Sequence, residues 1–144
     1  MGPRLRLLIE ACSRVRAEGT LIEVVATATA EELRREGVPE DAITTVGRLG
    51  VDQVERLLST AQVVYYLTEV ESFGCPLAEA RANGQPVLAA DNAHNAEVAE
   101  SVLMGLVPDA DSLELAVRRA LATTVTPSVV NDAAEYFDRV LEPA

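Results

Sequence analysis

The chain has 144 residues, 49% of them hydrophobic, and its 12 basic and 23 acidic residues give a net charge of −11. This length suits one domain with one core, and the apolar content argues against disorder. The acidic balance makes nucleic acid a poor partner, because its binding relies on cationic contacts to phosphate. No apolar run is long enough to predict a membrane span, and the first residues lack a signal-peptide layout.

The predicted elements alternate between helices, recognised by apolar residues three or four apart, and strands, recognised by short β-branched or apolar runs. In chain order they are a helix over 5–18, a strand over 21–26, a helix over 29–36, a strand over 43–46, a turn over 47–50, a helix over 51–59, a strand over 63–67, a helix over 76–83, a strand over 87–90, a helix over 93–102, an edge strand over 105–107, a helix from 111 or 112 to 121, and a last helix from 127 or 128. Thr29 followed by Glu32 predicts a capping box at the start of the second helix.

This alternation predicts an α/β fold, with a Rossmann-like parallel sheet and helices on both faces. We expect one domain over residues 1–144, with residues 127–144 forming a C-terminal helix that braces it. An α/β unit normally begins with the strand that leads into its first helix, whereas this chain begins with a helix. We therefore expect that the first strand of the sheet is missing.

The most informative segment is residues 71–87, which runs from one predicted strand through an elbow and a helix to the next strand. Gly74 permits a backbone conformation and a close ligand approach that a side chain would block. Pro76 suits the first helical position, where its missing N–H would be unpaired anyway. We expect free amides near Leu77 and Ala78 to carry the positive end of the helix dipole, where a diphosphate can bind.

Two carboxylates bracket this elbow: Glu71 precedes the turn, and Glu79 lies about one turn into the helix. An ionised carboxylate only accepts hydrogen bonds and therefore suits paired sugar hydroxyls. Either residue alone is better explained as a solvated surface carboxylate. The combination of strand, elbow, phosphate cradle and two carboxylates predicts a site for a sugar nucleotide.

Together with Gly84, Pro86, Val87 and Glu97, this segment resembles the C-terminal donor-binding domain of retaining glycosyltransferases of the GT-B type, which have two facing Rossmann-like domains and form the group called family 4 or group 1. The resemblance covers about residues 5–123. It implies a nucleoside diphosphate sugar as the donor substrate, without a cofactor or a metal. The implied donor-binding residues are Glu71, Ser72, Phe73, Gly74, Cys75, Pro76, Leu77 and Glu79.

The same resemblance implies a role for each part of the site. Glu71 would act at the catalytic centre by bonding hydroxyls of the transferred sugar. Backbone amides near Gly74 and Cys75 would face that sugar or its phosphate, and those near Leu77 would hold the diphosphate. Glu79 would bond the ribose hydroxyls, and the turn over 47–50 would lie near the base.

Two departures from the family leave alternatives open. Relatives carry an Arg and a Lys that neutralise the departing diphosphate, but Pro3 stands where the Lys is expected, and Arg4 or Arg6 would have to substitute. The acceptor-binding domain is also outside this chain. The chain is therefore the donor-binding half of a glycosyltransferase completed by an N-terminal acceptor-binding domain or partner chain, a non-catalytic nucleotide-sugar-binding or regulatory module, or a degenerate structural fragment; a dimer is a further alternative.

Other side chains that could carry chemistry have plain structural interpretations as well. His94, the only histidine, either contacts the ligand or lies in a surface loop. Tyr65 and Tyr66 either pack in the core or stack on a base. Cys12 and Cys75 have no metal-ligand spacing, so we expect two buried or half-buried free thiols and, because such thiols are usual in a reducing compartment, a cytoplasmic location.

Overall fold

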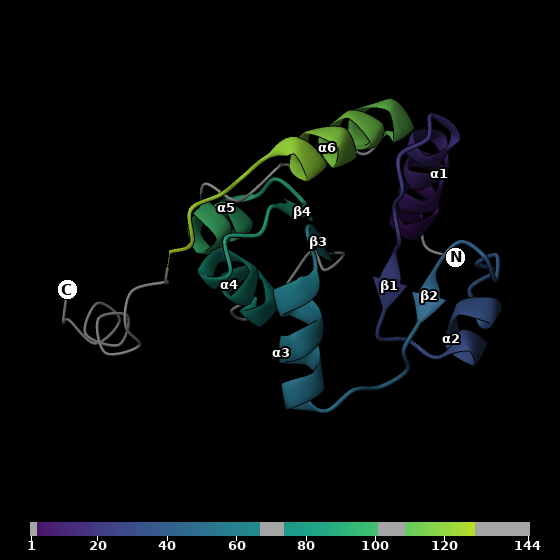
Figure 1. The fold of residues 1–144 in the computed structure, drawn as a ribbon, viewed down its shortest axis with the longest axis horizontal. Helices are drawn as coiled ribbons and strands as arrows, with labels where there is room; N and C mark the ends of the chain where they lie inside the picture. Colours follow the sequence, from purple (N-terminus) through teal and green to yellow (C-terminus); the bar gives the residue numbers. More distant parts are fainter. Residues whose placement is uncertain (1–2, 67–73, 101–108, 129–144) are drawn as a thin grey trace.

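A computed structural model describes residues 3–66, 74–100 and 109–128. Within these ranges helices and strands alternate along the chain, as predicted (Figure 1). The elements are α1 (Pro3–Ala17), β1 (Val25–Ala26), α2 (Ala30–Arg35), β2 (Thr44–Thr45), α3 (Val51–Thr60), β3 (Val64–Tyr66), α4 (Cys75–Ala82), β4 (Val87–Ala89), α5 (Ala93–Ala99) and α6 (Ala110–Ala122). None of these helices is long and apolar enough to cross a membrane.

The strands form parallel pairs, which confirms the mixed α/β class. β1 pairs with β2, with Val25 opposite Thr44, and β3 pairs with β4, with Tyr65 opposite Leu88. Among the described residues the two pairs are not hydrogen-bonded to each other, so the predicted single sheet is present as two short sheets. The strands are shorter than predicted because an apolar run marks buried chain, whereas a strand also needs a neighbour's backbone hydrogen bonds.

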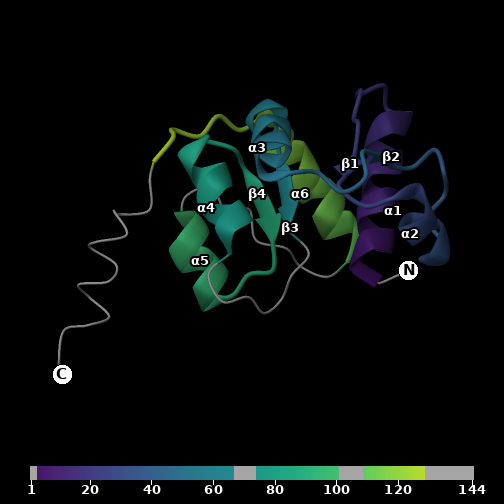
Figure 2. The same ribbon diagram turned by 90° about the horizontal axis from the view of Figure 1, so that it is seen from below.

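The β3–β4 pair has helices on both faces (Figures 1 and 2). Successive side chains of a strand point to opposite faces, and here Val87 and Ala89 pack with α4 and α5 while Leu88 packs with α1 and α6. Each face therefore has its own buried cluster. The first contains Val64, Tyr66, Leu77, Ala80, Val87, Ala89, Val98 and Ala99, and the second contains Leu8, Ala11, Cys12, Val15, Leu88, Leu113, Val117 and Ala120.

A smaller cluster of Val38, Ala42 and Ile43 lies beside the β1–β2 pair. Leu5 of α1 packs against both this cluster and the α1–α6 cluster, so α1 contacts both strand pairs. The predicted inward face of the first helix is confirmed for Leu8, Cys12 and Val15, which are buried. Helix α1 is thus the element that the two halves of the described structure share.

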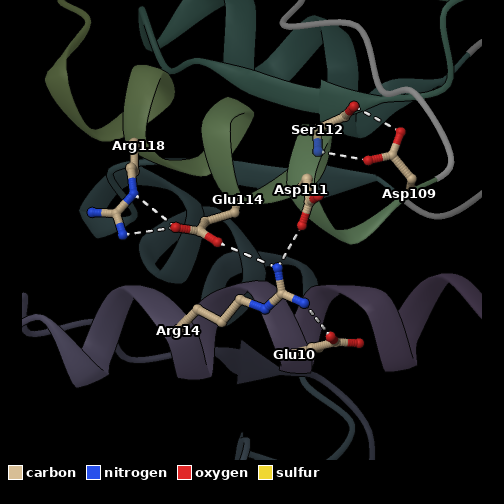
Figure 3. Close-up of polar contacts among 7 residues, drawn as sticks. All are labelled: Glu10, Arg14, Asp109, Asp111, Ser112, Glu114 and Arg118. Carbon is tan, nitrogen blue, oxygen red and sulfur yellow. Dashed lines mark hydrogen bonds and ion pairs between the residues drawn. The ribbon is translucent and has the colours of Figure 1, made fainter.

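Ion pairs join α1 to α6 along the edge of their apolar contact (Figure 3). The guanidinium of Arg14 donates to Glu10 and Asp111 at 2.6 Å each, and it lies 3.6 Å from Glu114. These hydrogen bonds, above all the one to Asp111, raise the pKa of Arg14. Asp111 therefore joins the two helices.

The prediction that Asp111 or Ser112 caps this helix is wrong, because the N-cap is Asp109. Its carboxylate accepts the Ser112 N–H at 2.8 Å, a bond that lowers the pKa of Asp109. The predicted strand over 105–107 lies outside the described residues. Pro127 and Ser128 are not helical, and the rest of the predicted bracing helix over 127–144 also lies outside them.

Candidate functional site

The elbow before α4 has the backbone conformation that the sequence predicts. Gly74 is the N-cap of α4, with φ of 81° and ψ of 53°, in the left-handed region that side chains disfavour. A Cβ atom at this position would also lie 3.1 Å from Cδ1 of Leu77. Pro76 is the second residue of the helix rather than the predicted first, because Cys75 already begins the helix. The backbone angle therefore favours glycine here, and a side chain would also have to displace the end of Leu77 slightly.

The amides of Leu77 and Ala78 are not free, so that part of the prediction is wrong. Both donate to the carbonyl oxygen of Gly74, at 2.9 Å and 3.3 Å. The bond from Leu77 spans three residues instead of the four of a regular α-helix. It satisfies an amide that a helix start normally leaves unpaired. The direction of this carbonyl depends on the left-handed angle of Gly74, which residue types alone do not reveal.

The side chains of α4 divide into an exposed and a buried face. Cys75 and Glu79 are exposed and lie four residues apart, so they share one face of the helix. Leu77, which is 0% exposed, points into the core with Ala80 and therefore anchors the start of the helix. Glu71, Ser72 and Phe73 lie outside the described residues, so the predicted pairing of Glu71 with Glu79 stays a prediction.

Helices α4 and α5 both begin on the side of the β3–β4 pair to which the strands run. Because the strands are parallel, their carboxyl ends meet at one edge, which is where ligands bind in open α/β sheets. The second of these helices begins just after β4, where the side chain of Asn92 accepts the Asn95 N–H at 2.8 Å. The predicted site residues that the structure describes therefore lie at the expected edge.

His94 lies at this same edge, on α5 beside the elbow, so the surface-loop interpretation is wrong. Its Nε2 atom is 3.6 Å from the position that a Cβ atom at Gly74 would occupy. This atom is buried, and it has no hydrogen-bond partner among the residues that the structure describes. A signal for this placement was in the sequence, because His94 comes four residues after the end of the predicted strand over 87–90.

The two tyrosines of β3 pack in the core, which confirms that interpretation. Tyr66 is 7% exposed and lies in the α4–α5 cluster, and Tyr65 packs against the α1–α6 cluster. The hydroxyl of Tyr65 donates to the backbone oxygen of Arg4 at 3.3 Å, and burial raises the pKa of this phenol. Tyr65 thus ties β3 to the first turn of α1.

Both cysteines are free thiols, as predicted. Cys12 is buried, but Cys75 is exposed, so the prediction that both thiols are at least half-buried is wrong for Cys75, which lies on the solvent face of α4. Burial raises the pKa of Cys12, which makes it a packing residue rather than a nucleophile. Within the described ranges, no three His, Cys, Asp or Glu residues are grouped as a metal site would need.

Comparison with known proteins identifies the family. Residues 3–123 match the family model described as Glycosyl transferases group 1. Searches of curated proteins and of solved structures found no match. The matched range covers most of the chain and contains the elbow, α4 and α5. The chain therefore belongs to the group 1 glycosyltransferases.

Proposed function

We propose that this chain is the donor-binding half of a retaining glycosyltransferase of the GT-B type, which transfers a sugar from a nucleoside diphosphate sugar. The observation that carries the proposal is the left-handed elbow at Gly74, followed by a helix that presents Glu79 to solvent at the carboxyl ends of two parallel strands. Such an edge, with a helix N-terminus beside a carboxylate, offers one contact for phosphate and another for sugar hydroxyls.

The paired amides of Leu77 and Ala78 change how the proposed cradle works. The diphosphate would contact the amides of Gly74 and Cys75, which precede the two amides already bonded to the Gly74 oxygen. Pro76 and Leu77 would hold the first turn in place, and Glu79 would accept the ribose hydroxyls. Glu71 would act on the transferred sugar as the catalytic residue, with Ser72 and Phe73 lining the donor site.

The two strand pairs support the further proposal that this domain lacks its first strand. In a doubly wound sheet the third, second, first, fourth and fifth strands lie side by side in that order. Without the first strand, the second and third remain paired, and so do the fourth and fifth. This is the pairing of β1 with β2 and of β3 with β4. An acceptor-binding domain or partner chain would supply the rest of the enzyme.

A second candidate function is a module that binds a nucleotide sugar without transferring it. Pro3 at the start of α1 favours this candidate, because that position needs a cation for the departing diphosphate in the first proposal. The two arginines that could substitute for this cation both lie on α1: Arg6 is exposed, and the backbone oxygen of Arg4 accepts the Tyr65 hydroxyl. The two candidates share the donor site and differ in whether adding an acceptor domain restores transfer.

A thermal-shift titration with UDP, GDP, ADP and their common sugars tests the donor site. A ligand at about a hundred times its dissociation constant stabilises a protein by about 2.7 kcal/mol. We expect one nucleotide to raise the denaturation midpoint of the wild type, and Glu79→Ala to lose most of that rise. Glu55→Ala, which removes an exposed carboxylate from α3, should keep it. A folded wild type that responds to none of these ligands would refute the donor site.

A further inference from the structure

Arg81 is an unusual residue for the inner face of α4. It is only 7% exposed, although the chain has an excess of acidic residues and most of its arginines lie at the surface. A buried cation is unfavourable unless charged and polar partners surround it. The partners of Arg81 come from two other segments of the chain, the end of α5 and the residues after α6, so Arg81 links both segments to α4.

The guanidinium contacts the end of α5 and the connection that follows α6. It lies 2.7 Å from Oε2 of Glu100, donates to the backbone oxygen of Val98 at 3.4 Å, and donates through Nε to Oγ of Ser128 at 2.9 Å. The backbone oxygen of Arg81 accepts the Ser128 N–H at 3.2 Å. Ser128 is therefore bound by both the side chain and the backbone of one residue.

Residues 125–128, which we call the C-terminal strap, also pack closely on the turn after α4. A Cβ atom at Gly84 would lie 2.6 Å from the backbone oxygen of Val125 and 3.0 Å from Cδ of Pro127. Gly84 has φ of +68°, so a side chain there would be strained and would also push the strap away. The strap, seen after α6 in Figure 1, is thus seated against α4 at two points.

Glu100, the ion-pair partner, has a backbone angle that side chains rarely adopt. Its φ is 48°, the one positive φ among the described residues other than glycine. Its side chain is 56% exposed, whereas that of Arg81 is 9% exposed, so Glu100 reaches inward from the surface to pair with the buried cation. A strained angle persists where surrounding contacts fix it, and the Arg81 ion pair is such a contact.

We propose that Arg81 is a positioning residue of the donor site, one that fixes the rotation of α4 by binding α5 and the strap. Arg81 follows Glu79 by two positions, or about 200° around the helix. Holding Arg81 on the buried face therefore directs Glu79 toward solvent and keeps the Gly74 elbow at the carboxyl ends of β3 and β4. The link to ligand binding rests on the proposed function, whereas the link to the order of α4 does not.

The test compares Arg81→Met and Arg81→Lys with Val117→Ala, a control that removes buried volume from the α1–α6 cluster on the other face of β4. Arg81→Met keeps much of the apolar length and removes the charge and the donors. For each variant we would measure the thermal midpoint and, well below that temperature, the affinity for UDP, GDP and ADP. A residue that only stabilises the fold changes the midpoint and leaves the affinity of the folded protein unaltered.

We expect Arg81→Met and Val117→Ala both to lower the midpoint, but only Arg81→Met to weaken binding of the nucleotide, by about tenfold. Arg81→Lys should recover part of that loss, since an ammonium can still pair with Glu100 but cannot reach all three acceptors. Wild-type affinity in Arg81→Met would overturn the positioning role.

If the wild type binds none of the three nucleotides, the proposed function fails and amide hydrogen exchange decides the positioning role alone. Arg81→Met should then speed exchange of the Leu77 and Ala78 amides more than Val117→Ala does at a matched loss of midpoint. Equal exchange at these amides in both variants would show that Arg81 does not order the start of α4.

Discussion

At the scale of single residues, Glu32 shows how a cap and an ion pair combine. The side chain of Glu32 accepts the Thr29 N–H at 2.8 Å, and its own N–H donates to Oγ1 of Thr29 at 3.2 Å. Arg48, from the turn before α3, adds a bond of 2.7 Å. These bonds, the one from the Thr29 N–H above all, lower the pKa of Glu32 from 4.5 to about 2. The predicted capping box is confirmed, and it also joins α2 to the turn over 47–50.

The lowered pKa gives a pH-dependent prediction for Glu32→Gln. A carboxylate with a depressed pKa stabilises the fold above its unfolded value, and this stabilisation is lost as pH falls through the folded value. We expect the variant to melt below the wild type above about pH 4.5, and the gap to close as pH falls toward about 2. Thermal midpoints measured across this range test it. Glu55→Gln, the same change on α3, should show no such closing; a constant gap for Glu32→Gln would contradict the assignment.

The candidate site was predictable at the level of residue types but not of bond directions. The sequence predicted the glycine elbow and the surface position of Glu79, and it predicted the helix start to within one residue, since Cys75 rather than Pro76 is first. It missed the bonds from Leu77 and Ala78 to Gly74, because these depend on where one carbonyl points. The placement of His94 beside Gly74 depends on how α5 packs, which is a tertiary property.

At the scale of elements, helix boundaries followed the capping signals where a single candidate was present. Thr29 was correctly predicted to cap α2, because Glu32 completes the reciprocal pair. For the start of α6 the sequence predicted Asp111 or Ser112 as the cap, whereas the cap is Asp109 and Asp111 is bonded to Arg14 on α1. The bond between Arg14 and Asp111 joins residues 97 positions apart. Such a contact leaves no local signal in the sequence.

The same contact predicts how α1 and α6 hold together. In Arg14→Met, the carboxylates of Glu10, Asp111 and Glu114 would lose their shared cation and repel one another (Figure 3). We expect the thermal midpoint to fall by a few degrees at low salt, and the loss to shrink at about 1 M salt, where the screening length is about 3 Å. Arg35→Met removes a cation that, within the described part of the chain, pairs with Glu31 alone, and it should cost less. A loss independent of salt would show that Arg14 acts through packing instead.

In the molecule as a whole, the described strands form two parallel pairs, whereas a single sheet was predicted. Val24, next to β1, and Val63 and Tyr65, at β3, all pack against the cluster around α1. Both pairs therefore rest on the same helix without a hydrogen-bonded strand between them among the described residues. The sequence predicted parallel strands from their apolar runs. It could not show which strands are neighbours, because pairing joins segments far apart in the chain.

The backbone geometry shows which groups a strand between the pairs would meet. Val64 donates to Pro86 on the β4 side, and Thr44 donates to Val24 on the β2 side. Because backbone groups alternate in direction along a strand, the N–H groups of Val25 and Tyr65 point away from their present partners. A strand that leads into α1 and runs parallel to both pairs would reach these two groups.

An added strand that bonds to these two N–H groups should stabilise the fold. We would extend the chain before Met1 by five β-branched residues and a short linker, and compare it with the same extension carrying a central proline, which cannot complete the ladder. The apolar extension should raise the thermal midpoint by several degrees and slow amide exchange at Val25 and Tyr65, because it supplies the acceptors that these N–H groups face. The proline version should do neither. Equal midpoints and equal exchange for the two extensions would mean that the space between β1 and β3 is not a strand position.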